Sequence, residues 1–373
     1  MERCVAILIA LLLMVNCSSV QAENWQIGPF IRVDDANPII KPDGSSVFFC
    51  PIQKKLVQWE CDHTFNPAAV VREGKVYLFY RAEDNYGQGI GHHTSRLGIA
   101  ESSDGIHFTR NSEPVLYPDQ DFQRSSEWPG GCEDPRIVQR EDGTYVMTYT
   151  QWSYFNEEND GSRNMPLLGI ALSRDLLHWE KKGYVFANSQ MGPCHSKSGS
   201  IVCKRVGDSL IAAKIKGKYW MYWGEGPIFG ATSEDLIDWN PIVDSEGNLL
   251  TILDKRPDKF DSRLVEPGPP ALLTNNGILL LYNGKNAALD GDPRIGIGAY
   301  AAGQVLFDKD DPTQVIERTE ESFFRPERDF EKTGQYKNGT VFVEGLIPFQ
   351  GRWLLYYGTA DSAVGVAACE MLE

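Results

Sequence analysis

Charged side chains recur inside otherwise apolar segments of this sequence, and three of them are carboxylates from well-separated segments: Asp134, Glu225 and Glu266. Glycoside cleavage needs such groups, because one carboxylic acid protonates the leaving oxygen and, in an inverting enzyme, a second carboxylate activates water on the opposite face. A single charge in a strand usually lies on a solvated face, but repetition at equivalent positions favours a shared site. The other charged candidates are Arg81, Asp84, Glu133, Arg136, Lys214, Lys285 and Asp361.

Motifs for other chemistries are absent from the sequence. There is no Gly-x-Ser-x-Gly nucleophile elbow, no phosphate-binding Walker loop and no His-Glu-x-x-His metal motif. Apart from the adjacent His92 and His93, the histidines are scattered. We therefore expect neither a metal nor a cofactor.

The overall charge excludes several classes of partner. The 373 residues carry 36 Lys and Arg against 51 Asp and Glu, a net charge of −15. Nucleic acids and anionic membrane surfaces require positive potential, so neither is an expected partner. Aromatic residues make up 11% of the chain, a proportion that fits both an aromatic-rich sheet and a sugar-binding cleft. The sequence carries no signal for the oligomeric state.

Five similar β-rich units follow one another along the chain. In each, a short strand leads through a Gly-bearing turn to a strand with an aromatic anchor, and a Gly-centred strand follows. Four strands per unit, repeated radially, predict an all-β, five-bladed β-propeller, with the stretch before the first unit supplying a closing strand. A β-sandwich with coincidental spacing is the alternative. The anchors are Tyr80, Tyr149, Tyr222, Tyr282 and Tyr357, spaced by 69, 73, 60 and 75 residues.

The first 22 residues are typical of a secretory signal peptide. Arg3 precedes an apolar run that ends near Val15, and Val20 and Ala22 occupy the small-residue positions of a cleavage site. The run is too short to span a bilayer, and no later stretch is a membrane-span candidate. We expect residues 23–373 to form one catalytic propeller that is exported to the periplasm or the cell surface. A lipid anchor at Cys17 is the alternative to cleavage after Ala22.

Six cysteines remain after the predicted cleavage site. No Cys-x-x-Cys spacing occurs among them, which argues against zinc and redox motifs. Two readings stay open: a disulfide between Cys50 and Cys61 or between Cys194 and Cys203, or six buried free thiols.

Several segments together are similar to glycoside hydrolase family 130. They read NPAAV, YLFYRAED, LGIAESSDGIHF, GCEDPRI, AKIKGKYWMYW and LYYGTADSAVGVA, and they cover nearly the whole mature chain. The resemblance implies a five-bladed propeller that acts on β-mannosides with inversion. Most members of that family are phosphorylases that release mannose 1-phosphate, and a smaller group hydrolyses β-1,2-linked mannose.

The resemblance also implies roles for individual residues. The acid of the EDPR motif falls on Asp134, which in the family relays its proton through a mannose hydroxyl. The mannose-binding positions fall on Asn66, Arg81, Lys214 and Asp361. Asp84 and Arg136 complete the candidate sugar contacts, and pairing of Arg136 with Glu133 or Asp134 is the alternative role for that arginine.

The sequence departs from the phosphorylase pattern where a phosphate would bind. Phosphorylases hold the phosphate dianion with cations, whereas the segment after Lys218-Tyr219 reads Trp223-Gly224-Glu225, although Arg163 lies near the second candidate position. At about 4 Å and an effective dielectric near 20, one carboxylate would cost a bound phosphate about 4 kcal/mol. A carboxylate can instead deprotonate water, and Glu266 is a second candidate for that role.

The sequence thus predicts an exported, inverting exo-β-mannosidase acting on β-1,2-linked mannosides, with Asp134 as acid and Glu225 or Glu266 as base. A β-mannoside phosphorylase is the main alternative. A non-catalytic glycan-binding propeller and a five-bladed furanosidase are the others.

Overall fold

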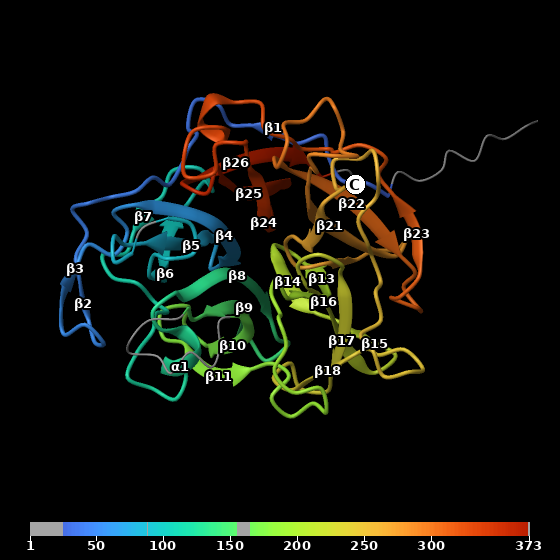
Figure 1. Cartoon of the computed structure of the whole chain (residues 1–373), viewed down its shortest axis with the longest axis horizontal. Helices are drawn as coiled ribbons and strands as arrows, with labels where there is room; N and C mark the ends of the chain where they lie inside the picture. The colour runs from blue at the N-terminus through green and yellow to red at the C-terminus, as the bar shows by residue number, and fades with distance from the viewer. Residues whose placement is uncertain (1–24, 88, 155–164, 372–373) are drawn as a thin grey trace, which may run out of the picture.

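The computed structural model describes residues 25–87, 89–154 and 165–371. Strands account for almost all regular structure in these ranges; the described helical segments are α1 (Arg124–Glu127) and the 3-10 turn η1 (Asp329–Glu331). In Figure 1 the strands form five antiparallel units around one axis, so the fold is the predicted five-bladed β-propeller. None of the described helices is long and apolar enough to cross a membrane. The predicted signal peptide, Cys17 and Arg163 lie outside the described residues.

The first two blades each contain four consecutive strands, innermost first. Blade 1 consists of β4 (His63–Arg72), β5 (Lys75–Glu83), β6 (Ser95–Ser102) and β7 (Thr109–Arg110). Blade 2 consists of β8 (Gly131–Gln139), β9 (Tyr145–Trp152), β10 (Leu167–Ser173) and β11 (Glu180–Tyr184).

Blades 3 and 4 have interrupted inner strands. Blade 3 contains β12 (Ser200–Ile201), β15 (Lys214–Ile215), β16 (Lys218–Trp223), β17 (Phe229–Ser233) and β18 (Trp239–Pro241), and the hairpin of β13 (Cys203–Val206) and β14 (Ser209–Ala212) connects it to its neighbours. Blade 4 contains β19 (Leu264–Pro267), β20 (Leu272–Leu273), β21 (Ile278–Lys285), β22 (Tyr300–Phe307) and β23 (Val315–Arg318).

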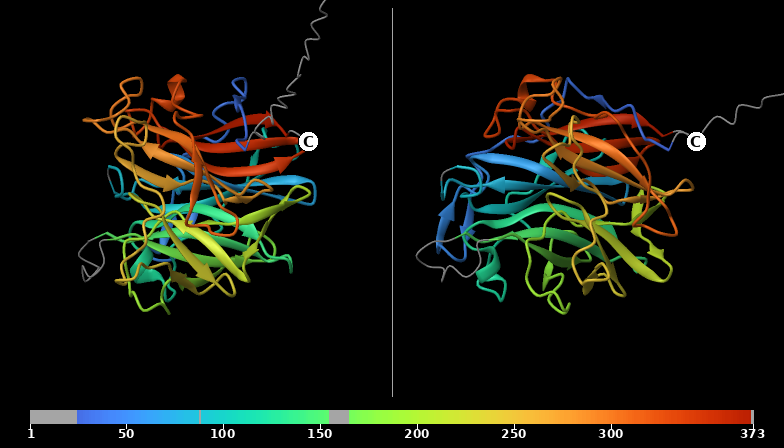
Figure 2. Two further views of the ribbon diagram at one scale, coloured as in Figure 1. Left: turned by 90° about the vertical axis from the view of Figure 1, so that its right-hand side faces the viewer. Right: turned by 45° about the vertical axis from the view of Figure 1, so that its right-hand side comes forward.

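Blade 5 joins the two ends of the described chain. Its strands are β24 (Val341–Phe349), β25 (Arg352–Thr359), β26 (Ala363–Glu370) and, as outermost strand, β1 (Ile31–Arg32). Ile31 pairs with Ala368 in this antiparallel closure, which confirms the predicted closing strand. A separate hairpin of β2 (Phe48–Cys50) and β3 (Lys55–Val57) lies at the outer side of blade 1 (Figure 1). Figure 2 shows the same arrangement of strands in two further views.

The tyrosine anchors explain why the repeat specifies a blade. Each anchor is fully buried in the second strand and lies opposite a glycine of the third strand, as Tyr80 does with Gly98. A Cβ atom on Gly98 would lie 2.4 Å from the Tyr80 ring, so only glycine leaves room for it. The other anchor pairs are Tyr149 with Gly169, Tyr222 with Gly230, Tyr282 with Gly303 and Tyr357 with Gly365.

In four blades the anchor hydroxyl also ties the inner part of the blade to its outermost strand. The hydroxyl donates to a buried carboxylate from the segment before the inner strand, and a cation on the outermost strand pairs with that carboxylate. In blade 3, Tyr222 donates instead to the carbonyl of Pro312. The four sets are Tyr80 with Glu60 and Arg110, Tyr149 with Glu127 and Lys181, Tyr282 with Asp261 and Arg318, and Tyr357 with Glu331 and Arg32.

The six described cysteines are all free thiols. The proposed Cys50–Cys61 and Cys194–Cys203 disulfides are therefore wrong. The alternative of buried free thiols is confirmed for four of the cysteines, whereas Cys61 and Cys194 are free but partly exposed. Cys50 and Cys203 are buried in apolar clusters that stabilise the blades without a crosslink.

Candidate active site

A cavity of about 350 Å³ is lined by side chains from all five blades. Asn66 and Arg81 of blade 1 and Asp134 of blade 2 line it, together with three carboxylates from the remaining blades. Those carboxylates are Glu225 in blade 3, Glu266 in blade 4 and Asp361 in blade 5. Six of the nine residues predicted for the site therefore share one cavity, including all three predicted catalytic carboxylates.

The inner strands present these side chains through local breaks in strand geometry. Asn66 and Asp134 have left-handed backbone, with φ of 44° and 47°, and each coincides with a register shift in its strand pairing. Ser198, before β12 in blade 3, has a φ of 58°. A bulge with left-handed backbone re-aims a side chain that regular alternation would send elsewhere, and such strain is typical of functional sites.

Asp134 lies among donors and cations. Asn66 Nδ2 donates to its Oδ1 over 2.8 Å, Arg81 Nη1 lies 3.2 Å from the same oxygen, and Lys197 Nζ lies 3.6 Å from Oδ2. Burial alone would raise the pKa of Asp134, but Arg81 and Lys197 outweigh burial, and the pKa lies well below its usual range. Asp134 is therefore ionised in the empty site.

Two other carboxyl groups that line the cavity, those of Glu133 and Asp361, hold their protons more tightly than Asp134 does. Glu133 Oε1 lies 2.8 Å from Arg81 Nη2 in an ion pair, yet burial raises the pKa of Glu133 to about 7. Burial likewise raises the pKa of Asp361 to about 7, against the opposing effect of Arg81. A proton is thus available close to Asp134 at neutral pH, although Asp134 itself is ionised.

The two glutamates of blades 3 and 4 differ in charge state. Lys197 is the main reason why the pKa of Glu225 falls to about 2, and His195, whose Nε2 lies 3.2 Å from Glu225 Oε2, lowers it further. Burial raises the pKa of Glu266 to about 7, and the hydroxyl of Ser198 donates to its Oε1. Glu225 is consequently ionised across the physiological range, whereas Glu266 titrates near neutrality.

Lys214 does not line the cavity. It is exposed, and its Nζ lies over the ring of Tyr219 at 4.9 Å. Lys197, which precedes the left-handed Ser198, lines the cavity instead. The structure therefore does not bring the predicted Lys214 together with the other candidate residues.

Asp84 and Arg136 are also displaced from the cavity, although both are buried beside it. Asp84 pairs with Arg96 at 2.8 Å and accepts backbone hydrogen bonds from Tyr86 and Thr94, so it organises the loop after β5. Arg136 lies behind the residues that line the cavity and donates to backbone carbonyls. Neither is placed to contact a sugar.

Several residues that sequence patterns did not single out also line the cavity. Lys197 and His195 lie just before β12, and Tyr300 and Tyr336 come from blade 4 and the loop before β24. Lys285, at the end of β21, lies with its Nζ 4.9 Å from both tyrosine ring centres. The sequence signal for Lys197 was its place in the segment Ser196-Lys197-Ser198-Gly199, at the start of the third repeat unit.

One group of described residues has the composition of a metal site. Ligand atoms of His63, Glu83 and His93 lie within 4.8 Å of one another. Both Glu83 oxygens, however, already accept hydrogen bonds, one from Arg81 at 2.6 Å and one from Gln335 at 3.1 Å. We assign no metal to this cluster.

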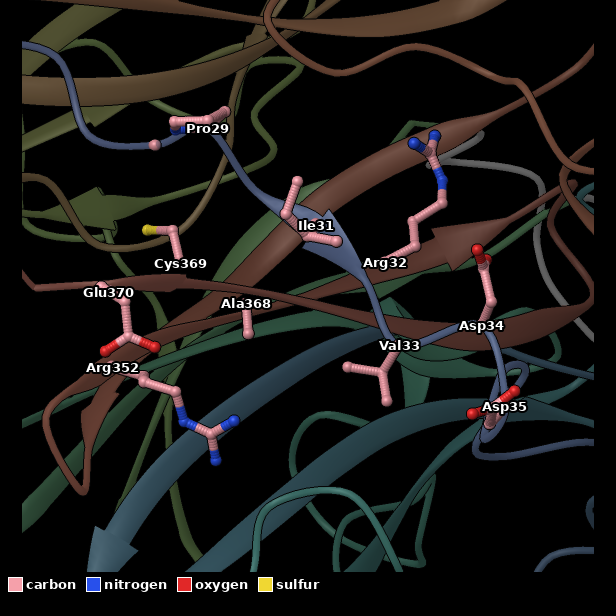
Figure 3. A pocket seen from close by; sticks show the side chains of 11 residues that line it. Pro29, Ile31, Arg32, Val33, Asp34, Asp35, Arg352, Ala368, Cys369 and Glu370 are labelled. Atoms are coloured by element: carbon pink, nitrogen blue, oxygen red, sulfur yellow. The ribbon is translucent and has the colours of Figure 1, made fainter.

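A larger cavity of about 730 Å³ lies where β1 closes blade 5. Figure 3 shows its lining side chains, among them Arg352 and Glu370. None of the residues predicted for the site lines it, so we place the candidate site in the smaller cavity, where the candidate carboxylates converge.

The chain is similar to known carbohydrate-active proteins. A family model described as Glyco_hydro_130, beta-1,4-mannooligosaccharide phosphorylase, matches residues 31–373. The 1,2-beta-oligomannan phosphorylase of Thermoanaerobacter sp. (strain X514) is 34% identical over 322 residues, which cover 85% of this chain and 93% of that protein.

Solved structures are more similar still. One solved structure carries the description "The GH130 family of mannoside phosphorylases contains glycoside hydrolases that target beta-1,2 mannosidic linkages in Candida mannan". Its sequence is 52% identical to this chain, and the match covers 93% of this chain and 95% of that chain, with a TM-score of 0.89. A glycosyl hydrolase from Bacteroides ovatus is 51% identical, with coverage of 93% and 95% and a TM-score of 0.88.

Proposed function

Because the chain belongs to glycoside hydrolase family 130, we propose that it is an inverting, exo-acting β-mannosidase that hydrolyses β-1,2-linked mannosides to mannose. The observation that carries the proposal is the ionised Glu225 in the cavity that also contains Asp134. The β-1,2 linkage is supported by the printed names of the similar proteins, which concern 1,2-linked oligomannan and β-1,2 mannosidic linkages.

The charge balance of the cavity disfavours a phosphate dianion. Of the described residues that line it, five carry carboxyl groups and three are Lys or Arg. Arg81 already pairs with Glu83, Glu133 and Asp134. A phosphate about 4 Å from ionised Glu225 would lose about 4 kcal/mol at an effective dielectric near 20. A neutral water molecule has no such penalty and can lose its proton to the carboxylate.

The proton balance assigns separate roles to the carboxyls. Asp134 is ionised at rest, so it first takes up a proton from the neighbouring Glu133 or Asp361, whose pKa values burial raises to about 7. It then passes that proton towards the leaving oxygen, through a mannose hydroxyl if it acts as its family relatives do. Water attacks the anomeric carbon from the opposite face, gives one proton to Glu225 or Glu266, and becomes the new hydroxyl of mannose. One proton enters the leaving group and one leaves water, so the reaction needs no further reactant.

Phosphorolysis is the second candidate, and the names of the curated relatives favour it. The relative at 34% identity and two others at 29% are all named phosphorylases of 1,2-linked mannosides. In this chain Lys197, His195 and Lys285 are the lining residues that would hold a phosphate.

Incubation of β-1,2-mannobiose with and without inorganic phosphate separates the two candidates. Hydrolysis predicts free mannose at the same rate in both tubes, and phosphorolysis predicts mannose 1-phosphate only when phosphate is present. The variants Glu225→Gln and Glu266→Gln identify the base, with Glu246→Gln, an exposed carboxyl on the loop after β18, as a matched control. Full activity in both site variants would overturn the assigned roles.

We also propose export, on the basis of the N-terminal apolar run and its cleavage signal. Hydrolysis fits an exported enzyme, because a sugar phosphate is useful only inside a cell. Detection of the mature chain, beginning at Glu23, in a periplasmic or surface fraction tests this proposal.

A further inference from the structure

Arg136 lies two residues after Asp134 on β8, and its guanidinium points to the backbone of another blade. Its Nε donates to the carbonyl of Gly268 over 2.7 Å, and its Nη2 donates to the carbonyl of Pro267 over 2.8 Å. Pro267 directly follows Glu266. Nη1 donates to the carbonyl of Asp134 itself over 3.2 Å. One side chain therefore contacts the backbone beside both an acid candidate and a base candidate.

Glu344 supplies the remaining contact from blade 5. Its Oε1 lies 3.4 Å from Arg136 Nη1, and neither side chain is more than about 1% exposed. Glu344 coincides with the register shift in the pairing of β24 with β25, much as Asp134 does in β8. The guanidinium is thus held between blades 2, 4 and 5, with the buried Glu344 carboxyl beside it.

No described backbone ladder joins β8 directly to β19, which carries Glu266. Blade 3 lies between blades 2 and 4 in the ring (Figure 1). The separation of Asp134 from Glu266 would otherwise depend on packing through that intervening blade. The planar fork of arginine can hold two carbonyls of one strand and one of another at fixed distances, whereas a lysine ammonium cannot.

We propose that Arg136 is a positioning residue that fixes the backbone of Asp134 relative to the backbone of Glu266 across the propeller axis. The proposal rests on the proposed function only in treating these two carboxyls as reacting groups. Displacement of a reacting group by about 1 Å costs on the order of 100-fold in rate, so loss of the clamp is expected to lower kcat. Asn66, Arg81 and Asp361, which line the cavity independently, are expected to keep KM close to its original value.

The test compares Arg136→Met and Arg136→Lys with Lys181→Met, which removes a buried cation from the outer strand of the same blade. Kinetic constants on β-1,2-mannobiose and melting temperatures are measured for each folded variant. The expected result is a kcat lower by about 100-fold in Arg136→Met, partial recovery in Arg136→Lys, and KM within about threefold in both. Lys181→Met is expected to lower the melting temperature with kcat unchanged. Should Lys181→Met not fold, Arg110→Met in blade 1 replaces it.

Two outcomes would overturn the clamp. The first is an Arg136→Met variant that keeps the kcat of the original chain. The second is a Lys181→Met variant that loses as much kcat as Arg136→Met does when both variants lose the same amount of stability. If Arg136→Met does not fold, the Arg136→Lys result decides alone: unchanged kcat and an unchanged pH profile contradict the proposal. The products of the original chain are identified in a separate assay. A phosphorolytic reaction there would refute the proposed function, but the role of Arg136 would still be decided by the kcat values of its variants.

Discussion

Asn66 donates a hydrogen bond of 2.8 Å from its Nδ2 to Oδ1 of Asp134, across the boundary between blades 1 and 2. Both residues have left-handed backbone and interrupt the pairing of an inner strand. The contact joins a position that the family resemblance implies for mannose binding to the position it implies for the acid. It also stabilises the ionised form of Asp134 in the empty site.

Asn66→Asp should reverse this effect at nearly constant volume. Aspartate tolerates left-handed backbone almost as well as asparagine, but its carboxylate would face Asp134 within hydrogen-bond distance and raise the pKa of both groups. A proton taken up by this carboxyl pair can then rest on residue 66 instead of Asp134, so we expect kcat/KM to fall by about 100-fold or more, with an unchanged circular dichroism spectrum. Activity near that of the original chain would show that the Asn66 contact does not influence the acid.

The pH dependence of kcat/KM distinguishes the two base candidates. Glu225, whose pKa Lys197 lowers to about 2, is ionised at every pH above that value. Glu266, whose pKa burial raises to about 7, is protonated below neutrality and ionised above it. If Glu225 is the base, kcat/KM should not decline as pH falls from 7 to 5. A rise in kcat/KM from pH 5 towards pH 7 would instead identify Glu266.

The alkaline side of the same profile reports on the proton donor. Burial raises the pKa of Glu133 and of Asp361 to about 7, so protons near Asp134 are lost as the pH rises through that value. We expect kcat/KM to decrease above about pH 7, since the acid must carry a proton to act. Constant kcat/KM up to pH 9 would contradict a donor drawn from this group.

Substitution of the two lysines compares the site cation with the surface cation. Lys197→Met removes the charge that lies between Asp134, Glu225 and Glu266, and we expect kcat/KM to fall by about 100-fold or more. Lys214→Met removes an exposed lysine of the same blade and should leave kcat/KM unchanged. The reverse ranking in a steady-state assay would restore Lys214 to the site.

The tyrosine sets that tie the blades together predict a stability difference between blades 2 and 3. Lys181→Met leaves the fully buried Glu127 without its cation, which should cost about 3–5 kcal/mol in the free energy of unfolding. Tyr222→Phe removes a neutral hydrogen bond to the Pro312 carbonyl and should cost about 1 kcal/mol. Denaturant unfolding of both variants measures the difference, and equal losses would contradict the role of the carboxylate.

The fold was predictable from sequence because its signal repeats. Tyr80 and Gly98 lie in register across neighbouring strands, and equivalent pairs recur in every blade, so five independent units indicate the same geometry. The closing role of β1 followed from the need of blade 5 for a fourth strand. In four of these pairs glycine leaves room for the tyrosine ring, whereas in blade 3 a Cβ atom on Gly230 would meet Ile252 and Trp220.

The site was predictable only where single motifs mark it. Asp134, Glu225 and Glu266 were found because each is a carboxylate in an apolar segment. Lys214 was predicted from its place in a segment that resembles the family. Strand alternation cannot show that Lys197 lines the cavity, because the left-handed Ser198 interrupts it. The direction of a bulged side chain depends on backbone angles that residue type alone does not determine.

Arg136 and Asp84 illustrate a second limit. Both are charged residues beside cavity-lining positions, and sequence cannot distinguish a group that lines a cavity from one buried behind it. The structure places Arg136 on the carbonyls of Pro267 and Gly268, residues more than a hundred positions away. Contacts of that range arise from the order of the blades around the axis.

The most direct test of the central claim places water and phosphate in competition in one tube. β-1,2-mannobiose is incubated with the protein in ¹⁸O-labelled water that contains inorganic phosphate in large excess, and the initial products are analysed by mass spectrometry and NMR. The account predicts α-mannose that carries one ¹⁸O atom at C1, with no mannose 1-phosphate. Mannose 1-phosphate without labelled mannose as an initial product would contradict it and establish the protein as a phosphorylase.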